Sequence, residues 1–106
     1  MTDFIINISV DEAIAQLASG AVLLDVREDD EWDAGHAPQA RHIRLSEIPD
    51  RFDELPRDQV IVCICHLGGR SGRATAYLAE QGFSSRNVEG GMVQWELQQQ
   101  EIVASP

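Results

Sequence analysis

The sequence predicts a single α/β domain with a mostly parallel central sheet covered by helices on both faces. Its 106 residues are the length of one domain. Short apolar runs alternate with segments of helical pattern along the chain, which is typical of a parallel sheet. One run, residues 21–26, is apolar apart from Asp25, as expected for a strand buried on both faces. We expect one domain over residues 1–106, with a frayed end over about residues 101–106.

The expected strands are short runs rich in β-branched and other apolar residues. The strongest strand signal is the segment Val60-Ile61-Val62-Cys63-Ile64. In chain order, strands are expected at residues 4–8, 21–26, 41–43, 59–65 and 83–88.

The expected helices are marked by capping residues. Ser9 is placed to cap the first helix, because Glu12 three residues later completes a capping box and Gly20 can end the helix. Ser46 is expected to cap a short helix that tolerates Pro49 in its first turn. In chain order, helices are expected at residues 10–18, 29–34, 47–55, 71–81 and 93–99.

Charge and cysteine content narrow the classes of partner and location. The formal net charge is −10 and all eight basic residues are Arg, so a nucleic-acid partner is not expected. No apolar run is long enough to span a membrane, and the first residues lack the pattern of a secretory signal. Cys63 and Cys65 are too few for a disulfide framework or a four-ligand zinc site, so we expect the cytoplasm.

The segment after the strongest strand carries the candidate chemistry. In open α/β sheets, ligands bind beyond the carboxyl ends of the strands, and this segment lies there. It then leads into a predicted helix. Its members are Cys65, His66, Leu67, Gly68, Gly69, Arg70 and Ser71.

This segment can activate a thiol. Gly68 and Gly69 allow a tight loop whose backbone N–H groups turn inward as an anion-binding nest. The following helix adds the positive end of its dipole, and Arg70 adds a permanent positive charge. Such surroundings lower the pKa of a thiol, and the thiolate is the reactive form. We therefore predict that Cys65 is a nucleophile rather than one more small buried side chain.

The neighbouring residues have structural alternatives. Cys63 faces the same side of the strand as Cys65, and we expect it to pack in the core rather than form a strained Cys-X-Cys pair. His66 either contacts the thiolate or the substrate, or is exposed without a role. Asp25 and Arg27 are expected to tie loops together, with Arg27 as an alternative border of the pocket. His36 is expected to make a structural hydrogen bond.

Four segments, in this order, resemble the rhodanese family, and together they cover nearly the full chain. Residues 24–28 resemble the family's Asp-Val-Arg strand end. Residues 31–38 resemble its segment of Glu, an aromatic, Gly-His and Pro. Residues 65–71 resemble its active loop, and residues 90–95 resemble its closing Gly-Gly and Trp signature. Within the loop, His66 stands where thiosulfate-using members often carry Arg.

The resemblance implies a rhodanese-like domain that transfers sulfur in two steps. The Cys65 thiolate would take the sulfane sulfur of a small anionic donor such as thiosulfate, forming a persulfide. An acceptor thiol, a protein acceptor or cyanide would then remove the outer sulfur. Arg70 would orient the donor and help to hold the loop. No metal or organic cofactor is implied.

Two other functions stay open at this point. The chain could be a carrier module that passes its persulfide sulfur to a partner protein. It could also be a cysteine phosphatase or arsenate reductase, whose loops place a Cys and an Arg around an anion. Those loops have five residues between Cys and Arg, whereas four separate Cys65 from Arg70 here, which favours sulfur chemistry.

Overall fold

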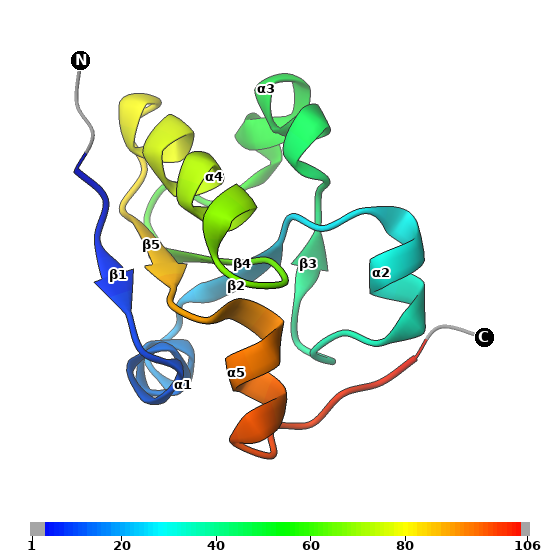
Figure 1. The fold of residues 1–106 in the computed structure, drawn as a ribbon. Helices are drawn as coiled ribbons and strands as arrows, with labels where there is room; N and C mark the ends of the chain where they lie inside the picture. The colour runs from blue at the N-terminus through cyan, green and yellow to red at the C-terminus, as the bar shows by residue number, and fades with distance from the viewer. Residues whose placement is uncertain (1–3, 105–106) are drawn as a thin grey trace.

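The computed structural model describes residues 4–104 and confirms the predicted fold class. A five-stranded sheet has the order β1-β5-β4-β2-β3, and all of its paired strands are parallel (Figure 1). The strands are β1 (Asn7–Ile8), β2 (Val22–Asp25), β3 (Arg41–His42), β4 (Ile61–Ile64) and β5 (Ser85–Val88). All five lie within the predicted ranges. The first is much shorter than its predicted range of 4–8.

Five α-helices and two short 3₁₀ turns connect the strands within the described residues. The helices are α1 (Val10–Ala18), α2 (Asp29–Ala34), α3 (Ile48–Arg51), α4 (Gly69–Glu80) and α5 (Gly91–Leu97). The 3₁₀ turns η1 (Leu45–Glu47) and η2 (Phe52–Glu54) flank α3. The predicted capping box of α1 is confirmed, because Glu12 N–H donates to Ser9 Oγ and Ser9 N–H donates to Glu12 Oε1.

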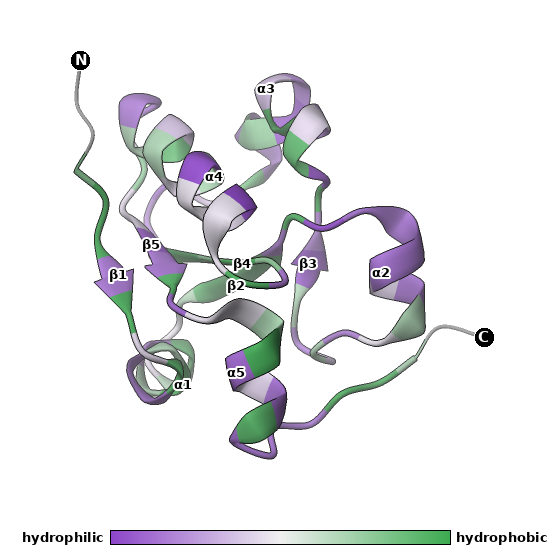
Figure 2. Cartoon of the chain, in the orientation of Figure 1, coloured by the Kyte–Doolittle hydropathy of each residue, from purple (hydrophilic) through white to green (hydrophobic). Residues whose placement is uncertain are grey.

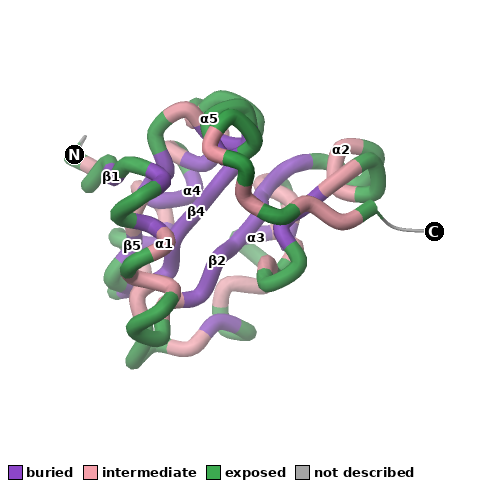
Figure 3. Tube along the Cα trace, turned by 90° about the horizontal axis from the view of Figure 1, so that it is seen from below, coloured by how far each residue is buried: buried purple, intermediate pink, exposed green. Residues whose placement is uncertain are grey.

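Side chains of β4 alternate between two core layers. Ile61 and Cys63 pack with Leu78 of α4 and with Ile48 of α3. Val62 and Ile64 pack on the other face with residues of α1 and α5. The two central strands are therefore buried on both faces, and Figures 2 and 3 show them as apolar and buried while α2 is polar and more exposed.

The predicted helix over residues 47–55 is wrong in its form. The segment is divided into η1, α3 and η2, and Ser46 lies inside η1 instead of capping a helix. Leu45, where η1 begins, has a tertiary contact, because its N–H donates to Val26 O at 3.0 Å, so the chain already turns one residue before Ser46. Pro49 does lie in the first turn of α3, as predicted.

Two helices begin two residues earlier than predicted. α4 begins at Gly69 instead of Ser71, and α5 at Gly91 instead of Val93. Their N-cap residues are Gly68 and Gly90, with φ of 114° and 80°. Glycine has no side chain to cap a helix, so the sequence lacked the Ser, Thr, Asp or Asn that usually marks a helix start.

The described end of the chain is attached to the domain. His36 and Val103 exchange two backbone hydrogen bonds of 2.8 Å, and Ile102 packs against the core. Ile102 and Val103 belong to the segment predicted to be frayed, and here they are packed and paired, while residues 105–106 lie outside the described residues. No helix between residues 4 and 104 is long and apolar enough to cross a membrane.

Candidate active site

Cys65 lies at the carboxyl end of β4, as the sequence predicted. It directly follows the strand, and only 1% of the residue is exposed. The amino ends of α4 and α5 both meet the loop there. Met92 N–H donates to Cys65 O at 2.7 Å, and Val93 N–H donates to His66 O at 3.2 Å. The loop is thus held between two helix starts, whose positive dipole ends favour negative charge at the sulfur.

Gly91 makes this approach possible. A Cβ at residue 91 would overlap the carbonyl oxygens of Cys65 and His66, and the residue has a φ of 53°. The Gly90-Gly91 pair of the sequence therefore lets α5 approach the active loop closely.

The Cys65 sulfur is surrounded by hydrogen-bond donors. Gly68 N–H lies 3.1 Å from Sγ, and Ser71 Oγ lies 3.2 Å from it. Burial by itself would raise the pKa of the thiol. The Ser71 hydroxyl and the backbone N–H groups of Ser71, Gly68 and Leu67 outweigh burial and lower the pKa of Cys65 below its ordinary value. The predicted nest is present, and it favours the thiolate.

Of the two loop glycines, only Gly68 adopts a conformation that needs glycine. Its φ is 114°, and its peptide N–H points at the sulfur. Gly69 is not among the residues of positive φ, and a Cβ there would meet nothing within 4 Å. The prediction that both glycines are conformationally required is wrong for Gly69, which already belongs to the first turn of α4.

Asn87 on β5 forms hydrogen bonds with Ser71 and Gly68, the two residues that donate to the Cys65 sulfur. Ser71 Oγ lies 2.5 Å from Asn87 Oδ1, and Asn87 Nδ2–H₂ donates to Gly68 O at 3.2 Å and Asn7 Oδ1 at 2.9 Å. A hydroxyl has one proton, so Ser71 can donate to the sulfur or to Asn87, but not to both at once. Sequence reasoning missed Asn87, because a polar residue in a short strand gives no signal of its partner 16 positions away.

Arg70 forms an ion pair with Glu31 of α2. Its guanidinium donates to both carboxylate oxygens of Glu31, at 2.7 and 2.9 Å. The Arg70 hydrogen bond is the main reason why the pKa of Glu31 falls from its ordinary 4.5 to about 2. The sequence placed Glu31 in the expected helix over residues 29–34 and in the family-like segment 31–38, but gave no sign that Arg70 is its partner. Arg70 is therefore a tether between the active loop and α2, and its charge is compensated.

A pocket of about 430 Å³ opens at the sulfur. The residues that line it come from the loop and from the first turns of α4: Cys65, His66, Leu67, Gly69, Arg70 and Arg73. Gly68 and Ser71 donate hydrogen bonds to Cys65 Sγ but do not line the pocket. His66 is exposed, and within residues 4–104 its imidazole makes no hydrogen bond to Cys65.

A family model described as "Rhodanese-like domain" matches residues 9–98. The chain belongs to the rhodanese-like family. It is 51% identical over 74 residues to "Putative sulfurtransferase YtwF" of Bacillus subtilis, covering 70% of this chain and 72% of that protein. It is 38% identical to thiosulfate sulfurtransferase GlpE of Pseudomonas syringae over 96 residues, 90% of each chain.

Solved structures give the same answer for the fold. A rhodanese-related protein from Thermoplasma volcanium is similar with a TM-score of 0.86 and 28% identity, covering 92% of this chain and 97% of that one. The predicted resemblance to the rhodanese family is confirmed.

In this rhodanese-like domain, Arg27 has the structural role that was predicted for it. Its guanidinium donates to Asp25 Oδ2 at 2.8 Å and to Gly35 O at 2.8 Å, tying β2 to the end of α2. Arg27 lines a neighbouring pocket that shares His66 with the Cys65 pocket, so it does not border the sulfur directly. His36 also makes the predicted structural bond, with its Nδ1 2.8 Å from Trp32 O.

Cys63 differs from Cys65 although the two share a core layer. It is fully buried, and burial raises the pKa of its thiol to about 12. Unlike Cys65, it has only the Thr75 side chain as a hydrogen-bond partner that lowers its pKa among the described residues. The prediction that Cys63 packs in the core is confirmed.

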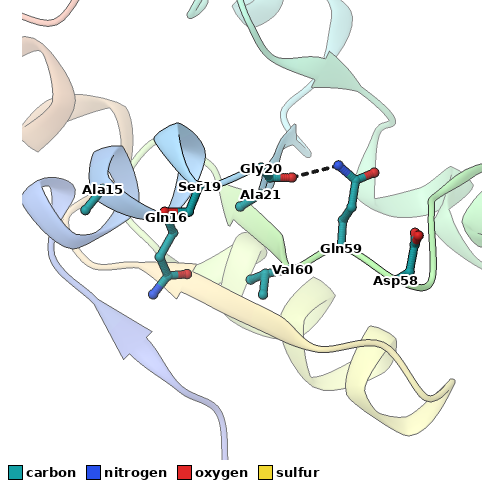
Figure 4. Close-up of a pocket in the computed structure, with 8 residues that line it drawn as sticks. All are labelled: Ala15, Gln16, Ser19, Gly20, Ala21, Asp58, Gln59 and Val60. Atoms are coloured by element: carbon teal, nitrogen blue, oxygen red, sulfur yellow. Dashed lines mark hydrogen bonds between the residues drawn. The ribbon is translucent and has the colours of Figure 1, made fainter.

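A further pocket, of about 520 Å³, lies at the other end of the strands from Cys65 (Figure 4). It is lined by residues next to the amino ends of β2 and β4, and Gln59 crosses it to donate to Gly20 O at 2.7 Å. Its lining includes neither cysteine, and so it offers no thiolate nucleophile.

Proposed function

We propose that this rhodanese-like domain is a thiosulfate sulfurtransferase that carries sulfur as a Cys65 persulfide to a thiol acceptor. One observation carries the proposal: Cys65 Sγ lies in an open pocket and receives hydrogen bonds from the backbone and from Ser71. The names of its relatives support sulfur transfer, and one is named for thiosulfate. We also propose the cytoplasm as its location, because a reducing compartment keeps Cys65 available.

The first half-reaction loads the cysteine. The Cys65 thiolate attacks the outer sulfur of thiosulfate, a new S–S bond forms, and the bond to the sulfite sulfur breaks with its electron pair leaving on sulfite. The enzyme is then the Cys65 persulfide. The N–H groups that lower the pKa of Cys65 also lie where they can stabilise a terminal sulfur anion.

The second half-reaction unloads it. An acceptor thiolate or cyanide attacks the outer sulfur, and the Cys65 thiolate leaves with the electron pair of the S–S bond. The acceptor is then a persulfide or thiocyanate. The same chemistry serves a small thiol or the thiol of a partner protein, since the pocket at Cys65 is open to solvent.

Loop length supports sulfur over phosphoryl chemistry. Four residues separate Cys65 from Arg70, and the described donors converge on one sulfur atom. Arg70, the residue that would bind a phosphoryl oxygen, is occupied by Glu31. We propose that aryl phosphates are not useful substrates.

The decisive experiment is to incubate the purified protein with thiosulfate and measure its intact mass. We expect one added sulfur atom, removed again by cyanide with formation of thiocyanate. Cys65→Ser should take up none, whereas Cys63→Ser should load normally. Absence of the added sulfur in the unmodified protein, or robust aryl phosphate hydrolysis by the same preparation, would overturn the proposal.

A further inference from the structure

The pocket at Cys65 contains two arginines in different electrostatic states. Arg70 gives both of its terminal nitrogens to Glu31, so its charge is largely compensated where an anion would approach. Arg73 follows three residues later, which places it on the same side of α4 one turn farther along. Both side chains line the pocket.

The charge of Arg73 is not paired with any carboxylate of the described residues. Arg73 is exposed, and among residues 4–104 no carboxylate lies within ion-pairing distance of its guanidinium. Apart from Cys65, the titratable side chains that line the pocket are His66, Arg70 and Arg73. No carboxylate of residues 4–104 lines it, although the whole chain has a formal net charge of −10. The pocket is thus a local site for an anion on an acidic protein.

We propose that Arg73, and not Arg70, recognises the anionic end of the sulfur donor. The inference rests on the proposed sulfurtransferase function and assigns the donor to small anions such as thiosulfate. Arg70 is then a positioning residue that holds the loop through Glu31. A guanidinium suits this task, because its planar donors match two oxygens of a sulfonyl or carboxylate group.

The test compares an anionic and a neutral reagent at the same sulfur. Iodoacetate and iodoacetamide both alkylate thiolates and differ in charge, so the ratio of their rates at Cys65 reports the potential in the pocket. Fragment masses assign the label to Cys65 rather than Cys63. We expect Arg73→Gln to lower the iodoacetate rate by about threefold to tenfold, as for a partly screened ion contact, and to leave the iodoacetamide rate nearly unchanged.

Arg41→Gln is the matched control. Arg41 is exposed on the edge strand β3 and does not line the pocket, and the substitution removes the same charge. It should leave the rate ratio within twofold. An unchanged ratio in Arg73→Gln, an equal fall in Arg41→Gln, or a larger fall in Arg70→Gln would each overturn the proposal. Gln is a good helix former, so the exposed Arg73→Gln variant is expected to fold.

The thiosulfate arm separates this inference from the proposed function. If thiosulfate loads Cys65, Arg73→Gln should raise the KM for thiosulfate by about threefold to tenfold with a smaller effect on kcat, since the contact is made on binding. If thiosulfate never loads Cys65 in the unmodified protein, the proposed function fails. The alkylation ratio still decides whether Arg73 makes the pocket selective for anions.

Discussion

Two cysteines separated by one residue have opposite chemistry in this protein. Both are buried in the same core layer. At Cys63, burial outweighs a hydrogen bond with the Thr75 side chain and raises the pKa of the thiol to about 12. Cys65 reaches the end of the strand, where backbone N–H groups are free of sheet pairing and can point at sulfur. Two positions along the chain therefore separate a core side chain in β4 from a thiol, just after the strand, whose surroundings favour the thiolate.

Ser71 is expected to control the thiolate of Cys65. Ser71→Ala removes a hydrogen bond to the charged form, so the pKa of Cys65 should rise and less thiolate should be present at pH 7. Iodoacetamide labelling at pH 7 should slow by about tenfold or more, as for the loss of one hydrogen bond to a charged group. The measurement is the labelling rate from pH 5 to pH 10.

Ser85→Ala is the control for that measurement. Ser85 is buried on β5 and donates to Thr75 O at 2.7 Å, without contact to Cys65. Its pH profile should match that of the unmodified protein. A profile for Ser71→Ala that coincides with the unmodified one would show that the backbone donors alone set the pKa.

Among the elements, the turn from β4 into α4 depends on one glycine. Gly68→Ala forces a side chain into a φ of 114° and should disturb the N–H bond to Cys65. We expect a loss of about 1–2 kcal/mol in the free energy of unfolding and slower persulfide formation. Urea unfolding and the rate of sulfur uptake measure the two effects.

Gly69→Ala is the matched comparison one residue later. Its new methyl group enters open space in the first turn of a helix. Stability should stay equal or rise by up to about 1 kcal/mol, because Ala favours a helix over Gly. Equal damage from both substitutions would contradict the assignment of the left-handed turn to Gly68 alone.

The contact between α2 and α4 should make stability depend on pH. The folded-state pKa of Glu31 is lowered from 4.5 to about 2, so its ion pair with Arg70 stabilises the protein above pH 4.5 and is lost as pH falls through 2. Both side chains are 30% exposed, so screening reduces the contribution to about 1 kcal/mol. Glu31→Gln should therefore unfold more easily at pH 7, and the difference should vanish near pH 2.

Glu54→Gln is the control for this pH dependence. Glu54 pairs with Arg51 at 2.9 Å, but its side chain is 53% exposed and the pair lies within one short segment. Its substitution should change the urea midpoint less than Glu31→Gln does. A difference between Glu31→Gln and the unmodified protein that persists unchanged at pH 2 would argue against the ion pair as its source.

For the molecule as a whole, Ile102 and Val103 pack the segment after α5 onto the domain. Val103 pairs with the backbone of His36, and Ile102 packs with the core layer of α1 and α5, close to Gly35. His36 in turn stacks on Trp32 at 3.5 Å between ring centroids. Ile102 and Val103 thus support the end of α2, and through Glu31 they support the loop that holds Cys65.

Ile102→Ala tests this closure. We expect a loss of about 1–2 kcal/mol in the free energy of unfolding, because a partly buried side chain is truncated. Leu97→Ala is the comparison, since Leu97 is 70% exposed on α5 and should change stability by less than about 0.5 kcal/mol. Equal thermal midpoints for the two variants would show that Ile102 does not contribute to the core.

Local sequence patterns were enough to predict the fold class, the order of the elements and the cysteine that we propose as the nucleophile. Continuous apolar runs identify β2 and β4, the Ser9 capping box identifies α1, and Cys65 follows the strongest strand. These features depend on residues close together in the chain, and so their patterns can be read locally.

Tertiary structure decided which distant residues complete the site. Glu31 meets Arg70 across 39 positions, and Asn87 reaches Ser71 across 16. The compensation of Arg70, the division of residues 45–54 and the attachment of Val103 all follow from such contacts. A charged residue or a capping residue looks the same in the sequence whether or not a distant residue forms a hydrogen bond with it. Its state is settled only when packing of the sheet and helices brings that partner within hydrogen-bonding distance.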